Sequence, residues 1–393
     1  MEILNSVYLE HFVELFLFIL CLSAIWFYSY AIYAAITSFP RYEIAQQFNP
    51  PITILKPICG IDKDSYQNLA SFCQQDYPNY QIIFAVLEGG DPGIEIVKKI
   101  IYSFPDLDLK LIIGDRDELT PIKIGPNRKV QNLANAVTKA KYDILLIADS
   151  DIRVEKDYLQ RVIQPLQDEK VGVVTCLYRS LAQGWVAILE AIGIATEFHA
   201  GVLVSKQLEG IKFALGSTIV IRKKVLEEIG GFTTVSDYLA DDFQLGYLPT
   251  QAGYEVVLSD YIVEHILTKT TLAESLKRQI RWARGTRFSR PCGYLGLIFT
   301  YGIVTSLLLV IITGGSTFAW IVLATTWLTR LIGAWVIGVI ILKDSQVRKF
   351  LWLVPIRDLI SFGLWCYSFF GNQVEWRGKR IKLTKGGKIV QIS

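Results

Sequence analysis

The sequence lacks any paired spacing of cysteines. Its 393 residues include six cysteines, which are scattered, and two or three of them stand within or beside apolar runs. Disulfide frameworks and zinc sites use cysteines at recurring short spacings, so this pattern predicts reduced thiols packed in the interior. The six are Cys21, Cys59, Cys73, Cys176, Cys292 and Cys366.

The sequence also lacks a strong charge of either sign. Its formal net charge is +3, and it contains no basic stripe with interleaved aromatic residues. Proteins that bind nucleic acid usually carry such a stripe, so we expect no nucleic-acid partner. Neither an internal repeat nor a low-complexity linker is found.

Apolar residues are abundant and gather at the two ends of the chain. They make up 51% of the sequence, and three runs are long enough to cross a bilayer: Phe12–Ile36, Gly296–Thr313 and Phe318–Leu342. No lysine or arginine precedes the first run, whereas a cleaved signal peptide begins with a basic region. The sequence therefore predicts a retained anchor and an integral, multi-pass membrane protein.

Basic residues predict the orientation of this protein. Arg41 and Lys56 follow the first span, and basic residues collect on the cytoplasmic side, so we expect a cytoplasmic catalytic domain. A fourth apolar segment, 350–370, contains Arg357 and Asp358, and a charge at the bilayer centre costs about 2.5–3.5 kcal/mol. We expect this segment to be a re-entrant or interfacial helical hairpin, with Arg357 facing protein or the lipid-acceptor entrance and the basic tail cytoplasmic.

Strand-like and helix-like segments alternate between the anchors, which predicts an α/β sheet of the nucleotide-binding type. A further apolar run, 183–204, carries Glu190, Glu197 and His199, so we expect it to lie in the interface or to roof a pocket. The predicted strands are 52–58, 80–88, 109–114, 144–148 and 171–179, and the predicted helices are 65–75, 93–104, 130–140 and 156–167.

One predicted strand ends in two acidic residues. In "DILLIADSDIRV" the apolar run 144–148 is followed by Asp149 and Asp151. Ligands gather at the carboxyl ends of strands in such sheets, and two carboxylates there can hold a divalent cation that also takes phosphate oxygens. A solvated turn that caps a helix is the alternative, and spacing alone does not decide between them.

Two other groups of polar residues stand where the sheet would place a site. Glu88 and Asp91 lie in the turn "VLEGGDPG", which ordinary turn chemistry also explains. Lys129 precedes a helix, where a diphosphate could bind, and it ends a loop, 115–129, that we expect over a phosphate-bearing ligand.

An acidic pair begins a later helix. Asp241 and Asp242 stand in "LADDFQLGY". The helix dipole favours acids at this position without any function, whereas a general base also requires a positioned carboxylate. Spacing leaves both interpretations open.

The stretch "LKRQIRWARGTRFSR" carries arginine at every third position just before an apolar run. Basic residues at the cytosolic edge of a membrane are ordinary anchors, but arginine also binds phosphate oxygens through two hydrogen bonds. The five are Arg278, Arg281, Arg284, Arg287 and Arg290.

In this order, the motifs resemble those of inverting family-two glycosyltransferases that make glycolipids, most closely the ceramide glucosyltransferases. The three aspartate motifs are matched by Asp91, Asp149 and Asp242, and the (Q/R)xxRW motif by "RQIRW". The resemblance runs from "LKPICGIDKDSYQNLASF" to "WRGKRIKL". Several eukaryotic members have a non-acidic residue in place of Asp151, so this chain looks more like the bacterial branch, which includes hopanoid glycosyltransferases.

The resemblance implies a GT-A-type nucleotide-sugar-binding domain inserted between N-terminal and C-terminal transmembrane helices. The implied divisions are an anchor (1–40), a cytoplasmic catalytic domain (41–290), membrane helices (291–371) and a basic cytoplasmic tail (372–393). The implied reaction moves glucose or N-acetylglucosamine from a UDP-sugar to a hydroxyl of a lipid acceptor, either ceramide-type, hopanoid or diacylglycerol.

The resemblance also implies a role for each matching residue. Asp242 would be the general base, and Asp149 and Asp151 would hold Mg²⁺ or Mn²⁺. The implied substrate-binding residues are Glu88 and Asp91 at the uridine, Lys129, Arg278 and Arg281 near the diphosphate, and Trp282 at the acceptor entrance. His265 is left out of the site, because a lone histidine after a strand is more often structural.

Two alternatives remain beside this interpretation. A processive polysaccharide synthase shares these motifs but needs enough spans to form a channel, and this chain has few. A non-catalytic scaffold that binds a UDP-sugar is the other alternative, although every candidate acidic residue is present.

Overall fold

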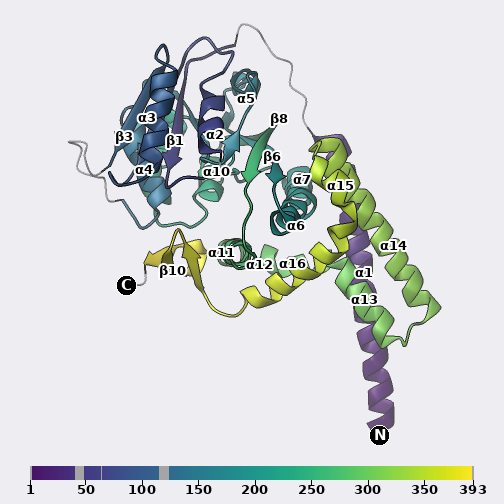
Figure 1. The fold of residues 1–393 in the computed structure, drawn as a ribbon. Coiled ribbons are helices and arrows are strands. Elements are labelled where there is room, and N and C mark those ends of the chain that lie inside the picture. The colour runs from purple at the N-terminus through teal and green to yellow at the C-terminus, as the bar shows by residue number, and fades with distance from the viewer. Residues whose placement is uncertain (1, 40–47, 63, 115–123, 392–393) are drawn as a thin grey trace. The chain divides into compact units, whose positions relative to one another are not determined.

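The computed structural model describes residues 2–39, 48–62, 64–114 and 124–391 (Figure 1). Its contacts divide the chain into two compact units. The sheet unit comprises Pro40–Ala182, Glu209–Thr268 and Arg380–Ser393, and the helical unit comprises Met1–Phe39, Gln183–Leu208 and Lys269–Lys379.

The sheet unit is built on an eight-stranded mixed sheet in the order β3-β2-β1-β4-β7-β6-β8-β5. The first four strands in this order are parallel, and β7 runs antiparallel to β4. The predicted α/β sheet is therefore confirmed, with strand ends shifted by a few residues. The strands are β1 (Ile52–Ile58), β2 (Tyr80–Val86), β3 (Asp108–Ile113), β4 (Ile144–Ile147), β5 (Ile152–Arg153), β6 (Val171–Ala182), β7 (Ile219–Arg222) and β8 (Glu255–Leu267).

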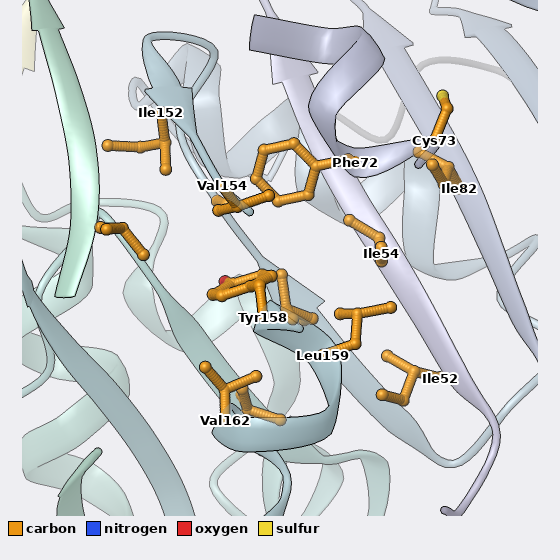
Figure 2. Close-up of a cluster of buried hydrophobic side chains, with 14 of the residues drawn as sticks. Ile52, Ile54, Phe72, Cys73, Ile82, Ile152, Val154, Tyr158, Leu159 and Val162 are labelled. Carbon is orange, nitrogen blue, oxygen red and sulfur yellow. The ribbon is translucent and has the colours of Figure 1, made fainter. Parts of the chain in front are cut away.

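Alternate side chains of the central strands form the core of this unit. Ile52 and Ile54 of β1 point to one face of the sheet, where they join a buried cluster with Phe72 and Tyr158 (Figure 2). Burying an apolar side chain of this size contributes about 1.5–3 kcal/mol, so the cluster fixes the strand register. Helices α2 (Ser65–Phe72), α3 (Gly93–Ser103) and α5 (Tyr158–Val162) supply this cluster, while α4 (Arg128–Val137) packs on β1 and β2.

The end of the chain also belongs to the sheet unit. Strands β10 (Lys379–Leu383) and β11 (Ile389–Gln391) pair antiparallel. The Ile389 amide donates to the Asp237 carbonyl at 2.7 Å, and the Leu239 amide donates to the Gly387 carbonyl at 3.1 Å. The basic tail is thus bound to the segment that precedes α10 (Asp241–Gln251) in the same unit.

The helical unit holds long apolar helices. Four helices of the described residues are long and apolar enough to cross a membrane, or five if a bent pair counts as one span. The four are Tyr8–Thr37, Trp185–Glu209, Thr317–Ile341 and Ser345–Ser368. The principal elements are α1 (Glu2–Ser38), α6 (Trp185–Gly193), η2 (Ile194–Phe198), α7 (His199–Glu209), α11 (Leu272–Ser289), α12 (Pro291–Gly296), η3 (Leu297–Thr300), α13 (Gly302–Ile312), α14 (Thr317–Ala334), η4 (Trp335–Ile341), α15 (Ser345–Phe350), η5 (Leu351–Leu353) and α16 (Val354–Ser368).

The predicted span Gly296–Thr313 is wrong as a single helix. The chain bends by 54° between the helices Pro291–Thr300 and Gly302–Ile312. The Tyr28 hydroxyl of α1 bridges this break, donating to the Thr300 carbonyl at 2.6 Å and accepting from the Gly302 amide at 3.1 Å. Backbone groups at a helix break need such partners in an apolar surrounding, so Tyr28 makes the break possible.

The segment after α14 departs from the predicted hairpin. The residues Ser345–Ser368 form one helical run in which α15, η5 and α16 follow one another directly. A hairpin would need a turn that reverses the chain, and this fully described segment has none. Arg357 faces protein, as predicted: it is buried and contacts Glu197 and Gln279.

The compact units divide the chain differently from the four ranges expected from sequence. Residues 183–208 and 269–290, which we had assigned to the catalytic domain, group with the apolar helices. Glu190, whose charge argued against a lipid-facing helix, is buried in the same unit and paired with Arg278.

Candidate active site

The two acidic residues after β4 lie at the carboxyl edge of the parallel strands. Asp149 and Asp151 occupy the short connection between β4 and β5. Lys56 holds this connection in place: it is fully buried in β1, and its Nζ donates to the Asp149 carbonyl at 2.6 Å. Burial lowers the pKa of the Lys56 ammonium to about 7, although the charges of Asp149 and Asp151 oppose this change.

The ammonium group of Lys129 contacts carboxylates from two distant parts of the chain. Its Nζ lies 2.7 Å from Asp149 Oδ1 and 3.5 Å from Asp241 Oδ2. Asn127, the cap of α4, positions this end of the helix, because its amide donates to Asp241 Oδ1 at 3.2 Å and its oxygen accepts from the Val130 amide at 3.1 Å. Three carboxylates with one ammonium leave the cluster formally negative once Asp242 is included.

Asp242 lies in the same cluster, in the first turn of α10 (Asp241–Gln251). Its Oδ2 accepts from the Gly216 amide at 3.1 Å, and its Oδ1 accepts from the Phe243 amide at 2.8 Å. A Cβ on Gly216 would lie 2.9 Å from Asp149 Oδ2 and 3.3 Å from Asp242 Oδ2. The approach of the two carboxylates therefore depends on glycine at this position.

The pKa values of Asp242, Asp149 and Lys129 are shifted for different reasons. Burial, followed by the charge of Asp241, raises the pKa of Asp242 to about 6. Partial burial also raises the pKa of Asp149, against the opposing charge of Lys129. Burial would lower the pKa of Lys129, but the carboxylates of Asp149, Asp241 and Asp242 raise it well above its usual range.

Asp151 has a different neighbour. His265 of β8 lies opposite Ile152 of β5, which brings its Nε2 to 3.6 Å from Asp151 Oδ2. The other ring nitrogen, Nδ1, is 3.0 Å from Ser180 Oγ. Although burial opposes it, the hydrogen bond and charge of His265 lower the pKa of Asp151 to about 2. Our exclusion of His265 from the site does not match its position, because strand pairing places it against a predicted metal ligand.

The donor set of Asp149 and Asp151 fits a hard divalent cation. Their side chains are 37% and 38% exposed, so their oxygens remain accessible to a ligand. Within the described ranges, no group of three His, Cys, Asp or Glu side chains could hold a metal ion. Mg²⁺ commonly binds through one or two carboxylates and completes its coordination with phosphate oxygens and water, so two carboxylates at one turn are sufficient.

The predicted uridine ligands have partners within the protein. Asp91 accepts from the Gly60 amide at 3.0 and 2.9 Å and from the Gly93 amide at 2.8 Å. It thereby ties the loop after β1 to the turn after β2. Glu88 Oε1 accepts from Arg128 Nη2 at 2.5 Å. The loop predicted over a phosphate-bearing ligand lies mostly outside the described residues, since 115–123 are not described.

The arginine-rich stretch forms α11 of the helical unit, and several of its arginines have partners there. Arg278 makes a two-pronged contact with the buried Glu190, at 2.6 and 2.7 Å. Arg284 and Arg287 donate to carbonyls at and beyond the end of α16. These contacts satisfy helix-terminal carbonyls, so the two arginines are explained by packing.

Arg281 and Trp282 differ from these neighbours. The Arg281 guanidinium lies 5.9 Å from the Trp282 ring centre and 5.7 Å from that of Trp376. Trp282 is 39% exposed. Within the motif "RQIRW", Arg278 therefore braces the helix, Arg281 is half-buried beside two tryptophan rings, and Trp282 is exposed.

Sequence reasoning missed Lys56, Asp241 as a partner of Lys129, Gly216 and His265. Lys56 carried a signal, since a lysine inside the apolar strand "ITILKPI" has no solvent to reach and must find a buried partner. Gly216 and His265 carried none, because their proximity to the carboxylates depends on strand order.

The family model described as "Glycosyl transferase family 21" matches residues 16–389. The chain is similar to Ceramide glucosyltransferase 1 of Caenorhabditis elegans, with 26% identity over 360 residues that cover 86% of this chain and 73% of that protein. It is also similar to the ceramide glucosyltransferase of Komagataella phaffii, with 37% identity over 148 residues. That match covers 35% of this chain and spans only 29% of the relative's length.

A solved structure has the same fold. The mannosyltransferase PcManGT from Pyrobaculum calidifontis, in complex with GDP-Man and Mn²⁺, aligns with a TM-score of 0.55 and 16% sequence identity. The alignment covers 92% of this chain and 99% of that one. At this identity the likeness establishes the fold alone, which is the GT-A-type α/β fold.

Proposed function

The chain belongs to glycosyl transferase family 21 and is a glycosyltransferase, and from this premise we propose that it moves a hexose from a UDP-sugar to a hydroxyl group of a lipid acceptor. The hexose is glucose or N-acetylglucosamine, and the acceptor is ceramide-type, a hopanoid or a diacylglycerol. The convergence of Asp149, Asp241 and Asp242 around Lys129 at the carboxyl edge of the sheet carries this proposal. The names of the relatives support a lipid acceptor.

Asp242 is the general base of this reaction. Its pKa of about 6 leaves it ionised at neutral pH but more basic than an ordinary aspartate. The amide of Gly216 fixes Oδ2, so the other oxygen is oriented by the first turn of α10. Removal of the acceptor proton by Asp242 permits one in-line displacement, with inversion at the anomeric carbon.

The residues that match the family motifs bind the donor. Asp91 shapes the loops at the uridine end, with Glu88 beside it, and Lys129 offers positive charge near the diphosphate. Arg281 faces the diphosphate, and Trp282 lines the acceptor entrance. Arg278 fixes the position of α11 through its contact with Glu190.

Asp149 and Asp151 would hold Mg²⁺ or Mn²⁺, which would neutralise charge on the departing diphosphate. Lys56 and His265 hold these two residues in position. If the ion supplies about 4 kcal/mol of transition-state stabilisation, excess EDTA should slow transfer by roughly a thousandfold. Re-addition of Mn²⁺ or Mg²⁺ should restore the rate, whereas full activity in EDTA would contradict the metal assignment.

One experiment tests the reaction and its substrates together. Membranes containing the protein are incubated with labelled UDP-sugars and a lipid extract of the host, and the product is identified by mass spectrometry. Membranes with Asp242→Asn serve as the matched control. A labelled lipid that only wild-type membranes produce is expected. A labelled polymer would instead support a processive synthase, and binding of UDP-sugar without product would support a scaffold.

A further inference from the structure

Helix α16 carries two adjacent charged residues that meet opposite charges in different ways. Asp358 is buried and accepts from Arg330 at 3.0 and 2.8 Å. Arg330 also donates to the carbonyl and the hydroxyl of Thr196, at 3.2 and 3.1 Å. This pair is enclosed and hydrogen-bonded on both sides, which is the arrangement of a structural ion pair among apolar helices.

The neighbouring pair is more open. Arg357 Nε donates to Glu197 Oε1 at 3.3 Å, and its Nη1 donates to Gln279 Oε1 at 2.5 Å. The Glu197 side chain is 28% exposed, against 5% for that of Asp358. Glu197 thus contacts Arg357 while part of its side-chain surface remains accessible to a ligand.

The backbone of the facing helix is adapted to this pair. A Cβ on Gly193 would collide with Arg357 Nε, so the guanidinium lies where only glycine leaves room. The chain then widens into the π-helix Ile194–Phe198, which carries Glu197. Single π-turns of this kind often occur at functional sites, because they reorient one side chain.

Aromatic side chains lie near the pair formed by Arg357 and Glu197. Tyr301, at the break before α13, lies within electrostatic range of Glu197 and Arg357. Its ring packs 5.4 Å from that of Phe362 and 5.9 Å from that of Trp365. A polar pair beside aromatic rings suits a molecule with a polar head and an apolar body.

The charges of the two pairs indicate which kind of polar head would bind. Arg330 and Arg357 are balanced by Asp358 and Glu197, so the group is formally neutral and offers little attraction to a phosphate. A carboxylate accepts from a hydroxyl, and a guanidinium donates to a hydroxyl or carbonyl oxygen.

We propose that Glu197, Arg357 and Gln279 form a subsite for the neutral, hydroxyl-bearing headgroup of the lipid acceptor. This inference rests on the proposed function and assigns the acceptor side of it. Gln279 connects the subsite to α11, the helix that also carries Arg281 and Trp282.

Photolabelling of the full-length protein in lipid nanodiscs tests the subsite without turnover. The probes are a ceramide and a phosphatidic acid that carry the same diazirine chain. The ceramide should label peptides within 185–209 and 345–368, and Glu197→Gln should reduce this labelling about fivefold, because the neutral amide is a weaker acceptor than the carboxylate. Arg348→Gln, which changes an exposed arginine of α15, should leave labelling unchanged.

Kinetics give a second measurement. With UDP-glucose and a fluorescent short-chain ceramide, Glu197→Gln should raise the acceptor KM about tenfold and leave the donor KM unchanged. If Glu197→Gln fails to fold, Glu197→Asp shortens the side chain and should show the same KM split.

Unchanged ceramide labelling in Glu197→Gln, or equal labelling by phosphatidic acid, would overturn the subsite. Labelling that depends on Glu197, in a protein that transfers no sugar, would uphold the subsite and refute the proposed function. The two failures are therefore distinguishable.

Discussion

Asp241 and Asp242 are adjacent in the sequence but have different partners. Asp241 accepts from Asn127 and lies beside Lys129, so its charge is used within the protein. Asp242 is held by two backbone amides and has the pKa of a usable base. A general base contributes roughly 10²–10⁴-fold to the rate, which sets the expected effect of removing it.

Asp242→Asn is therefore expected to lower kcat by at least about a hundredfold while the donor KM changes little. The asparagine keeps the shape and can still accept from Gly216, but it cannot take a proton. Steady-state kinetics with Asp241→Asn as the matched variant provide the comparison. Near-normal turnover in Asp242→Asn, with collapse in Asp241→Asn, would show that the base was assigned to the wrong residue.

The pH dependence follows from the same residue. Because burial and the charge of Asp241 raise the pKa of Asp242 to about 6, its basic form is lost as the pH falls through that value. The value of kcat/KM should therefore be constant above about pH 7 and fall tenfold per pH unit well below pH 6. A profile that falls only below about pH 4, where an ordinary aspartate titrates, would contradict the assignment.

At the scale of single elements, breaks in the helices are compensated by side chains from other helices. Tyr28 of α1 bridges the break before α13, and Arg284 of α11 donates to carbonyls at and beyond the end of α16. An unsatisfied buried backbone group costs about 1–3 kcal/mol, so these contacts allow short helices to replace one straight span.

Tyr28→Phe should destabilise the protein by about 1–3 kcal/mol, since it leaves the Thr300 carbonyl and the Gly302 amide without this partner. Thermal unfolding in detergent measures the change. Tyr33→Phe removes the hydroxyl of an exposed ring on the same helix and should leave the unfolding temperature unaltered. Equal effects of the two variants would mean that the hydroxyl does not support the break.

At the scale of the whole molecule, the sheet constrains how the chain crosses a membrane. Ala182 and Glu209 both belong to the sheet unit, and one sheet cannot stand on both sides of a bilayer. We therefore predict that the helix Trp185–Glu209 does not cross, although its length and composition would permit this. The same reasoning requires an even number of crossings between Thr268 and Arg380, where three candidates lie.

We predict that the bent pair and Thr317–Ile341 are the two crossings, which leaves Ser345–Ser368 as the segment that does not cross. We predict that the tail shares the cytoplasmic side with the catalytic sheet. A cysteine at the exposed Lys379 should then react with a membrane-impermeant maleimide only after cells are permeabilised. The test uses a Cys292→Ser background, because Cys292 is exposed in the wild-type chain.

A cysteine at the exposed Glu10, which precedes the apolar run Phe12–Ile36, is the matched control and should react in intact cells. Labelling of the Lys379 cysteine from outside would show that the last segment crosses.

The sequence by itself determined the features that depend on neighbouring residues. The apolar runs of β1 and β4 and the acidic pair that follows β4 were predicted within a residue. The predicted apolar runs Phe12–Ile36 and Phe318–Leu342 coincide with the candidate spans Tyr8–Thr37 and Thr317–Ile341 to within four residues at each end. Strand and helix periodicity, and the residues that end each element, are local properties, so no knowledge of the fold was required.

Only the tertiary structure decided which charges meet. His265 approaches Asp151 because β8 pairs with β5, and Lys129 reaches Asp241 because α4 and α10 end at the same edge of the sheet. Arg278 pairs with Glu190, 88 residues away. Such pairings follow from strand order and helix packing, which bring together residues whose separation along the chain gives no signal of contact.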